Sequence, residues 1–315
     1  MKALFLLLPL LCCQAYAAGG GAPRVYRLKT GGYERVYRVY APAGLEAGRK
    51  YPLLLLLHGG GGDGKGMARL AKGGFEALAD RHGAVLVYPD GVDKNWNDYR
   101  GDKSRKAQRE NIDDVAFLTE MVGAILKRYP ADPARVYAAG ISNGAMMSYT
   151  LACRAADRFA AIAPVAGAMP ANLAAACKPA RPVAALIISG TEDNLVHWEG
   201  GPVTGPWGRK KLGLTIPVEK SRDFWLAADA CAAEKKKVSE KDADPEDGTA
   251  VTREVYPGCA GGSSVEFIKI WGGGHTWPGG LQYLPAPVIG KTSREIDATL
   301  EIWDFFMRHR LPAAE

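Results

Sequence analysis

The sequence of 315 residues lacks several features that would assign it to a large class of proteins. It has no internal repeat and no apolar run of the roughly 20 residues that a membrane-spanning helix needs. Lys and Arg outnumber Asp and Glu by 40 to 34, but the basic residues are scattered rather than gathered along one face. A scattered net charge of +6 predicts no nucleic-acid-binding surface. We therefore expect neither nucleic acid nor membrane as a partner.

The N-terminus has the three parts of a secretory signal peptide. Lys2 precedes the apolar run Ala3–Leu11, and Ala15-Tyr-Ala17 supplies small residues for cleavage. We expect residues 1–17 to be removed and the protein to be extracellular or periplasmic. A lipoprotein anchor at Cys12 or Cys13 is the alternative, but leucines precede these cysteines where small residues are needed. Residues 18–315 are then expected to form a single domain, because a chain of this length can bury one large core.

Four cysteines follow this leader, and none of them forms a C-x-x-C pair. The spacing therefore predicts no zinc cluster, and we expect neither a metal nor another cofactor. An even number of cysteines in an exported chain predicts disulfides. Of the three possible connectivities, sequence proximity favours Cys231 with Cys259 and Cys153 with Cys177. The charged segment between Cys231 and Cys259 is interpreted as solvated surface.

Strand-like and helix-like patterns alternate along the chain. The run Tyr51–Leu57 is continuously apolar, as in a strand that is covered on both faces. The other strand candidates are 25–28, 35–40, 84–88, 136–139, 160–165, 182–189 and 265–270. Helical patterns lie at 68–81, 113–129, after 142 and at 296–308. The order predicts an α/β fold with a mostly parallel eight-stranded sheet and helices on both faces. The Gly- and Pro-rich stretch 199–215 is interpreted as an excursion at the carboxyl edge of this sheet.

A nucleophile candidate lies where one of these strands gives way to a helix. Gly140-Ile-Ser142-Asn-Gly144 matches the G-x-S-x-G elbow, in which a strained turn lifts the serine hydroxyl clear of the sheet. The two glycines leave room where the chain passes close to itself. The alternative interpretation is that Ser142 is simply a helix N-cap.

A serine nucleophile needs a base and an acid that orients the base. His275 follows Ser142 and lies in a glycine-rich loop immediately after the last predicted strand, which is the order expected for this type of elbow, whereas His309 lies near a helix end. Asp193, in the turn after strand 182–189, is the preferred acid, and Glu192 is the fallback. Asp193 could instead serve only as an Asx-turn residue.

Acyl transfer also requires donors for the developing oxyanion. One donor is expected from the amide of Asn143, and the other from the loop His58-Gly-Gly-Gly-Gly62, at Gly60. This loop also partly matches a phosphate-binding P-loop, but Gly66 stands where Ser or Thr would bind Mg²⁺.

Taken together, these motifs resemble a known family. They are His58-Gly-Gly-Gly, Tyr88-Pro-Asp-Gly91, Trp96-Asn-Asp98, Asp113-Asp114-Val, Gly140-Ile-Ser-Asn-Gly-Ala-Met-Met, Gly190-Thr-Glu-Asp193 and Gly274-His-Thr-Trp-Pro-Gly279. They are similar to the secreted polyhydroxybutyrate depolymerase and feruloyl esterase branch of the α/β-hydrolases, near carbohydrate esterase family one. The resemblance implies an α/β-hydrolase fold and metal-free ester hydrolysis by Ser142, His275 and Asp193.

The substrate is open to more than one interpretation. We expect a small-molecule, oligosaccharide or polysaccharide ester, above all feruloyl or acyl esters of plant cell walls, with Trp96, Trp198 and Trp277 as pocket walls. Hydrolysis of hydroxybutyrate oligomers is the alternative. A non-catalytic carbohydrate-binding protein that keeps the fold is a third interpretation, because fold alone does not guarantee activity.

Overall fold

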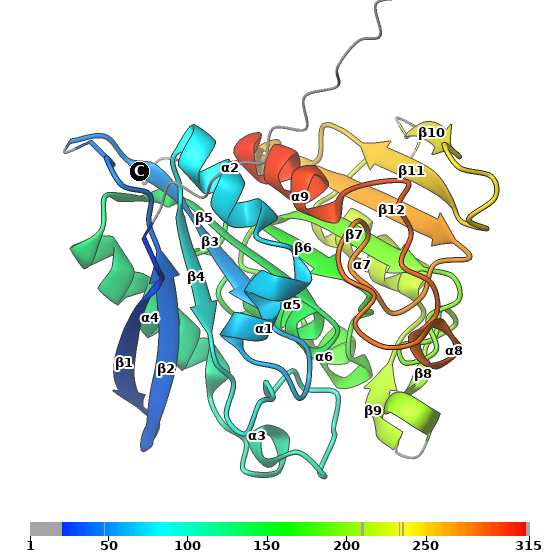
Figure 1. The fold of residues 1–315 in the computed structure, drawn as a ribbon, viewed down its shortest axis with the longest axis horizontal. Helices are drawn as coiled ribbons and strands as arrows, with labels where there is room; N and C mark the ends of the chain where they lie inside the picture. The colour runs from blue at the N-terminus through cyan, green and yellow to red at the C-terminus, as the bar shows by residue number, and fades with distance from the viewer. Residues whose placement is uncertain (1–20, 47, 209–210, 233, 235, 313–315) are drawn as a thin grey trace, which may run out of the picture.

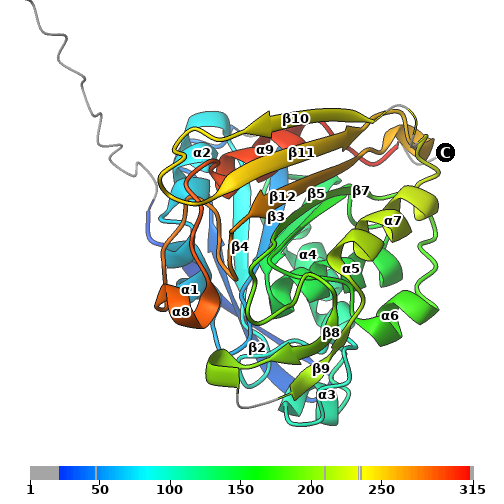
Figure 2. The ribbon, with the colours of Figure 1, turned by 90° about the vertical axis from the view of Figure 1, so that its right-hand side faces the viewer.

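The computed structural model describes residues 21–46, 48–208, 211–232, 234 and 236–312, so the predicted signal peptide at 1–17 lies outside the described residues. Ten strands of the described chain form one sheet with helices on both faces (Figures 1 and 2). In sheet order they are β1 (Arg24–Thr30), β2 (Tyr33–Tyr40), β4 (Val85–Pro89), β3 (Tyr51–Leu57), β5 (Ala131–Ile141), β6 (Ala161–Val165), β7 (Ala184–Gly190), β12 (Val265–Trp271), β11 (Ala250–Tyr256) and β10 (Lys237–Lys241). In this sheet order, β4, β3, β5, β6, β7 and β12 pair in parallel. The two pairs at each end of the sheet are antiparallel.

Helices cover the two faces of this sheet unequally. One face carries α1, α2 and α9, and the opposite face carries α4, α5, α6 and α7 (Figure 2). The helices are α1 (Gly64–Leu70), α2 (Gly74–His82), α3 (Lys106–Arg109), α4 (Asp114–Arg128), α5 (Asn143–Arg154), α6 (Ala171–Ala176), α7 (Val218–Ala228), α8 (Ala286–Ile289) and α9 (Ala298–Met307), with 3-10 turns η1 (Pro206–Gly208) and η3 (Ala260–Gly262). No helix in the described part of the chain is both long and apolar enough to cross a membrane.

The leucine run of β3 divides its side chains between two cores. Leu53, Leu55 and Leu57 pack in the core under α4 and α5. Leu54 and Leu56 pack in the core under α1, α2 and α9. All five are fully buried, because successive side chains of a strand point to opposite faces. The continuous apolar run is therefore the signature of a central strand covered on both sides.

The α/β prediction is confirmed, but the predicted number of eight strands is wrong. All eight predicted strands are present, and β10 and β11 extend the sheet beyond β12. Both lie in the charged segment that we interpreted as solvated surface. All five residues of β10 are exposed, so no buried face imposes an apolar period on its sequence. Its hydrogen bonds to β11 make it a strand.

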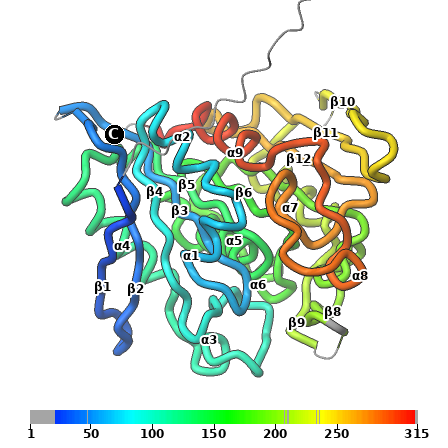
Figure 3. Tube along the Cα trace, in the orientation of Figure 1, coloured from blue at the N-terminus to red at the C-terminus, as the bar shows by residue number. Residues whose placement is uncertain are grey.

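Two other segments differ from the sequence-based expectation. The helix expected over 68–81 is two helices, because Lys72 and Gly73 adopt positive φ values of 54° and 70° between α1 and α2. The excursion at 199–215 contains a two-stranded ribbon of β8 (Gly201–Thr204) and β9 (Lys211–Thr215). This ribbon lies below α8 in the lower part of the trace in Figure 3.

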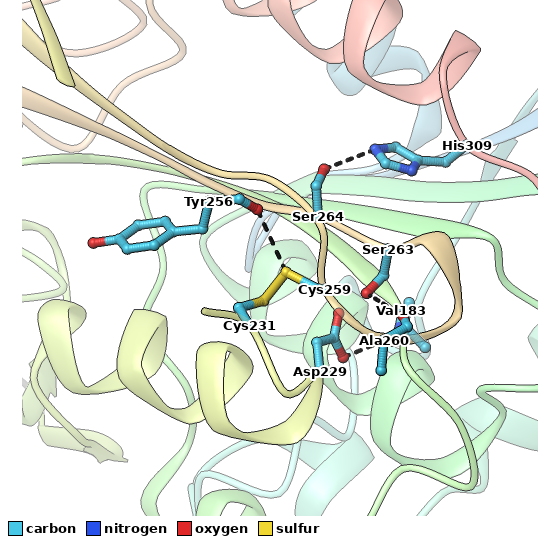
Figure 4. The surroundings of a disulfide bond; sticks show 9 residues. All are labelled: Val183, Asp229, Cys231, Tyr256, Cys259, Ala260, Ser263, Ser264 and His309. Carbon is cyan, nitrogen blue, oxygen red and sulfur yellow. Dashed lines mark hydrogen bonds between the residues drawn. A yellow bond between two sulfur atoms is a disulfide. The ribbon is translucent and has the colours of Figure 1, made fainter. Parts of the chain in front are cut away.

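Two disulfides join the cysteine pairs that the sequence favoured, Cys153 with Cys177 and Cys231 with Cys259. Figure 4 shows the second bridge, which ties the segment after α7 to the turn before β12. Asp229 lies beside it and accepts a hydrogen bond from the backbone N–H of Val183 at 3.1 Å. On the chain-entropy model, a bridge across 28 residues stabilises the fold by about 3 to 4 kcal/mol.

Candidate active site

Ser142 occupies a strained turn between β5 and α5. Its φ of 58° and ψ of −118° are unusual for a residue with a side chain. A Cβ at Gly140 would lie 2.6 Å from the carbonyl carbon of Gly144, and a Cβ at Gly144 would lie 2.2 Å from the carbonyl oxygen of Leu57. Only glycine fits at these two positions, which permits the turn. Such a turn is the geometry of a nucleophile elbow.

Ser142 holds the N-cap position of α5 without acting as a cap. Its hydroxyl makes no capping hydrogen bond to the helix. Its backbone N–H is held by the carbonyl oxygen of Val165, at 3.0 Å, on the neighbouring strand β6. The hydroxyl is thus left free for chemistry at a half-buried position. Backbone strain at a position that the fold holds so firmly is a feature of functional sites.

Asp193 and His275 meet through a short, buried contact. Asp193 Oδ2 lies 2.7 Å from His275 Nδ1, and both side chains are 2% exposed. Asp193 follows β7 and His275 follows β12, and these two strands are parallel neighbours. The loops approach so closely that a Cβ at Gly190 would lie 2.2 Å from the carbonyl oxygen of Gly273. Hydrogen bonding to the carboxylate would hold the Nδ1–H tautomer and leave Nε2 free as a base.

The other carboxylate oxygen of Asp193 stabilises the turn in which this residue lies. Asp193 Oδ1 accepts from the backbone N–H groups of Leu195 and Val196, at 2.8 and 2.7 Å. The residue is therefore an Asx-turn residue and the partner of His275 at once. Glu192, the fallback acid, is exposed.

Ser142 and His275 both line one cavity of about 550 Å³. This volume is in the range of small-molecule binding sites. Gly60 and Asn143 line the same cavity. In the described chain, the N–H groups of these two residues donate to no backbone acceptor. They are therefore available to an oxyanion, as the sequence-based interpretation requires.

His58 holds the glycine loop in place through hydrogen bonds rather than acting as a base. Its Nδ1 lies 2.8 Å from the carbonyl oxygen of Gly59, and its Nε2 accepts from the N–H of Gly91 at 3.0 Å. This pattern corresponds to the neutral ring with its proton on Nδ1. Burial lowers the pKa of His58, which keeps the ring in this form.

A buried polar network holds Asn143, and sequence reasoning missed it. Asn143 Oδ1 accepts from the N–H of Trp96 at 2.8 Å, and its Nδ2 donates to Asp98 Oδ2 at 2.6 Å. Asp98 also accepts from Arg100 and Gln108, both at 2.8 Å. Burial raises the pKa of Asp98 although Arg100 lowers it. The Trp96-Asn-Asp98 motif was the available signal, but the motif alone does not reveal that its carboxylate reaches Asn143.

The three tryptophans expected as pocket walls do not line the cavity. Trp96 and Trp277 are fully buried, with their indole N–H groups donating to the carbonyl oxygen of His58 and the hydroxyl of Thr299. Trp198 packs against Phe267, with 5.8 Å between ring centroids. The indole rings pack beneath the loops instead of lining the cavity, because burial of a large apolar ring stabilises the fold more than exposure does.

The cavity wall consists mostly of aliphatic side chains from distant segments. Tyr283 adds an aromatic ring, and its hydroxyl donates to the carbonyl oxygen of His275 at 3.0 Å. The apolar lining residues are Met67, Leu70, Ile141, Leu195, Val203, Pro206, Leu212, Leu281 and Leu284. In the described residues, no group of three or more His, Cys, Asp or Glu side chains is placed to hold a metal ion.

Comparison with known proteins matches residues 30–245 to the family described as "Putative esterase". The "Putative esterase NocK" of Nocardia uniformis subsp. tsuyamanensis is 34% identical over 284 residues, which cover 88% of this chain and 80% of that protein. Feruloyl esterase B of Piromyces equi is 31% identical over 74% of this chain, but the match spans only 41% of that longer protein. An acetyl xylan esterase from Aspergillus awamori shares the fold, with a TM-score of 0.57 at 15% identity over 90% of this chain and 99% of that one.

Proposed function

Because this chain belongs to the esterase family of the α/β-hydrolases and is a carboxylic ester hydrolase, we propose that it works through a covalent acyl-enzyme on Ser142. The observation that carries the proposal is the strained Ser142 in the same cavity as His275, whose ring is held by Asp193 at 2.7 Å. In α/β-hydrolases this arrangement positions a serine for attack on a carbonyl carbon.

In the first half-reaction, Ser142 Oγ bonds to the ester carbonyl carbon as His275 Nε2 takes its proton. Negative charge develops on the carbonyl oxygen, and the N–H groups of Gly60 and Asn143 stabilise it. The tetrahedral intermediate then collapses, the bond to the alcohol oxygen breaks, and His275 gives its proton to that oxygen. In the second half-reaction, water attacks the acyl group with His275 again as base, which releases the acid and restores Ser142. Asp193 holds the ring throughout.

We propose feruloyl or acyl esters of plant cell-wall polysaccharide as the main substrates. The similarity to feruloyl esterase B supports this choice. Hydroxybutyrate oligoesters are the second candidate, and the aliphatic wall of the cavity favours them because it suits methyl-bearing acyl units. A panel of methyl ferulate, acetylated xylan and hydroxybutyrate oligomers would rank these substrates by kcat/KM.

The serine mechanism has a direct test. We expect Ser142→Ala to lower the kcat for 4-nitrophenyl acetate and methyl ferulate by at least about 1000-fold, because the acyl-enzyme can no longer form. A fluorophosphonate probe should label the wild-type protein at Ser142 and leave the variant unlabelled. Ser148→Ala is the matched control, since Ser148 is buried in α5 and donates to the carbonyl oxygen of Gly144. Retained hydrolysis in Ser142→Ala would show that another residue is the nucleophile. An unlabelled, inactive wild type would favour the non-catalytic carbohydrate-binding interpretation.

We also propose that residues 1–17 are a signal peptide, that 18–315 form one catalytic domain, and that the protein is secreted. The two disulfides support secretion, because such bonds persist in oxidising compartments.

A further inference from the structure

The cavity at Ser142 carries more positive charge than hydrolysis of a neutral ester requires. Its described lining includes the three arginines Arg69, Arg100 and Arg105 but only one carboxylate, Asp63. That carboxylate is already engaged, because Asp63 Oδ1 accepts from the N–H of Gly66 at 2.7 Å. The mechanism proposed above uses none of these arginines.

Arg100 is a structural cation. Its side chain is 3% exposed and donates to Asp98 Oδ2 at 2.8 Å, with Asp102 Oδ2 at 3.6 Å from its other terminal nitrogen. Asp102 Oδ1 is committed to its own turn, where it accepts from the N–H of Ser104 at 3.0 Å. These bonds fix the loop that carries Arg100 and Arg105, so the geometry of this loop is largely set before a ligand arrives.

Arg105 and Arg69 are differently placed. The ion pair of Arg105 with a carboxylate is long, with its Nε 3.6 Å from Asp102 Oδ2, and its side chain is 32% exposed. The terminal nitrogens of Arg105 make no hydrogen bond to another described residue. Its Nε is buried and also lacks a hydrogen-bond partner. Arg69 on α1 is exposed and takes part in no ion pair within the described chain. The cavity therefore has guanidinium N–H groups that no other described residue binds.

Resting on the ester hydrolysis proposed above, we propose that Arg105, assisted by Arg69, binds a free carboxylate of the substrate while Ser142 attacks its ester bond. A guanidinium group binds a carboxylate through paired hydrogen bonds that are stronger than neutral ones. The rest of the wall is aliphatic, with Leu195, Leu281 and Leu284 in the lining. Among the esters that the enzyme cleaves, this site would favour those with an apolar body and one anionic end. A linear hydroxyacid oligoester has this chemistry, because its last unit ends in a carboxylate.

The test compares pairs of substrates in which one member carries this charge and the other has an uncharged group in the same place. The first pair is the 3-hydroxybutyrate dimer and its terminal carboxamide, which place the charge on the alcohol side of the scissile ester. The second pair is mono-4-nitrophenyl glutarate and 4-nitrophenyl valerate, which place it on the acyl side. We expect the wild-type protein to prefer the anionic member of at least one pair. In that pair, the ratio of kcat/KM values should fall about tenfold in Arg105→Gln and further in Arg69→Gln/Arg105→Gln. Arg105→Lys should fall between wild type and Arg105→Gln.

The ratio of kcat/KM values separates substrate recognition from folding and from chemistry. A misfolded or poorly active variant loses activity toward both substrates of a pair, which leaves the ratio unchanged. Lys103→Gln is the charge-matched control, since Lys103 is exposed and lies outside the cavity lining. Its ratio should equal that of the wild type. If the double arginine variant keeps the wild-type ratio in both pairs, the carboxylate site is disproved while ester hydrolysis stands. If the wild-type protein cleaves none of the four esters, nor methyl ferulate or acetylated xylan, the proposed function itself fails.

Discussion

At the scale of single residues, the two oxygens of Asp193 have separate tasks. One accepts the N–H groups of Leu195 and Val196, and the other faces His275 Nδ1. The first task shapes the loop after β7, and the second sets the tautomer of the proposed base. Different substitutions can separate the two tasks, because asparagine keeps one oxygen and alanine keeps neither.

We expect Asp193→Asn to lower kcat by about 10⁴ with little loss of stability, because an amide nitrogen facing His275 favours the wrong tautomer. Asp193→Ala should lose activity and also about 2 to 4 kcal/mol of stability, since two buried N–H groups lose their acceptor. The measurements are kcat for 4-nitrophenyl butyrate and urea unfolding midpoints.

Glu192→Gln is the control for this pair, because Glu192 is adjacent but exposed. It should behave like the wild type. An Asp193→Asn variant with normal kcat would remove Asp193 from the mechanism.

The side chains of His58 and Asn143 hold the backbone of the proposed oxyanion site in place. His58 anchors the glycine loop through Gly59 and Gly91, and Asn143 ties α5 to Trp96 and Asp98. These bonds leave the neighbouring backbone N–H groups aimed at no backbone acceptor in the described chain. Preorganised donors of this kind stabilise developing charge without reorganisation.

At the scale of elements, the end of α7 contains a buried carboxyl group beside a disulfide. Asp229 is fully buried, and one of its oxygens has no hydrogen-bond partner among the described residues. Burial raises its pKa to about 7, although the hydrogen bond from the N–H of Val183 lowers it (Figure 4). The group is therefore neutral in the folded protein at pH values where it is ionised in the unfolded chain.

The pH dependence follows from the sign of this shift. Between about pH 4 and pH 7 the folded state binds one more proton at Asp229 than the unfolded state, so stability falls as pH rises through this window. The contribution lost by pH 7 is at most about 4 kcal/mol. Asp229→Asn should remove this slope and become more stable, relative to wild type, at pH 8 than at pH 4.5.

Urea unfolding at the two pH values measures this difference. Asp304→Asn, on the exposed side of α9, is the control and should keep the wild-type slope. An unchanged slope in Asp229→Asn would show that Asp229 ionises normally in the folded protein.

At the scale of the whole molecule, the site is assembled at the carboxyl ends of neighbouring parallel strands. The loops after β3, β5, β7 and β12 supply Gly60, Ser142, Asp193 and His275. The β8–β9 ribbon and the segment before α8 close the cavity with Val203, Leu212 and Leu284. Residues more than 200 positions apart in the chain therefore share one cavity.

The proposed secretion leads to a prediction for the chain expressed with residues 1–17. Expressed with its leader in a host that secretes it, the mature chain should begin at Ala18 and contain no free thiol in denaturant before reduction. Four thiols should appear after reduction, because Cys12 and Cys13 leave with the leader. N-terminal sequencing and thiol titration measure both outcomes. Ala17→Lys should block cleavage as the matched control. An unprocessed secreted chain, or free thiols at Cys231 and Cys259, would contradict the prediction.

The sequence alone was enough to locate eight of the ten strands of the main sheet and the candidates Ser142, Asp193 and His275. These features depend on short stretches of chain: a strained turn between two glycines, and polar residues directly after apolar strands. Which side chains face the cavity depends on the tertiary structure, because the wall of the cavity is built from segments that are distant in sequence. The tertiary structure buried Trp96 and Trp277 and brought Arg69 and Arg105 into the lining. It also made a strand of β10, whose exposed residues are ordered by their partner β11 rather than by an apolar period of their own.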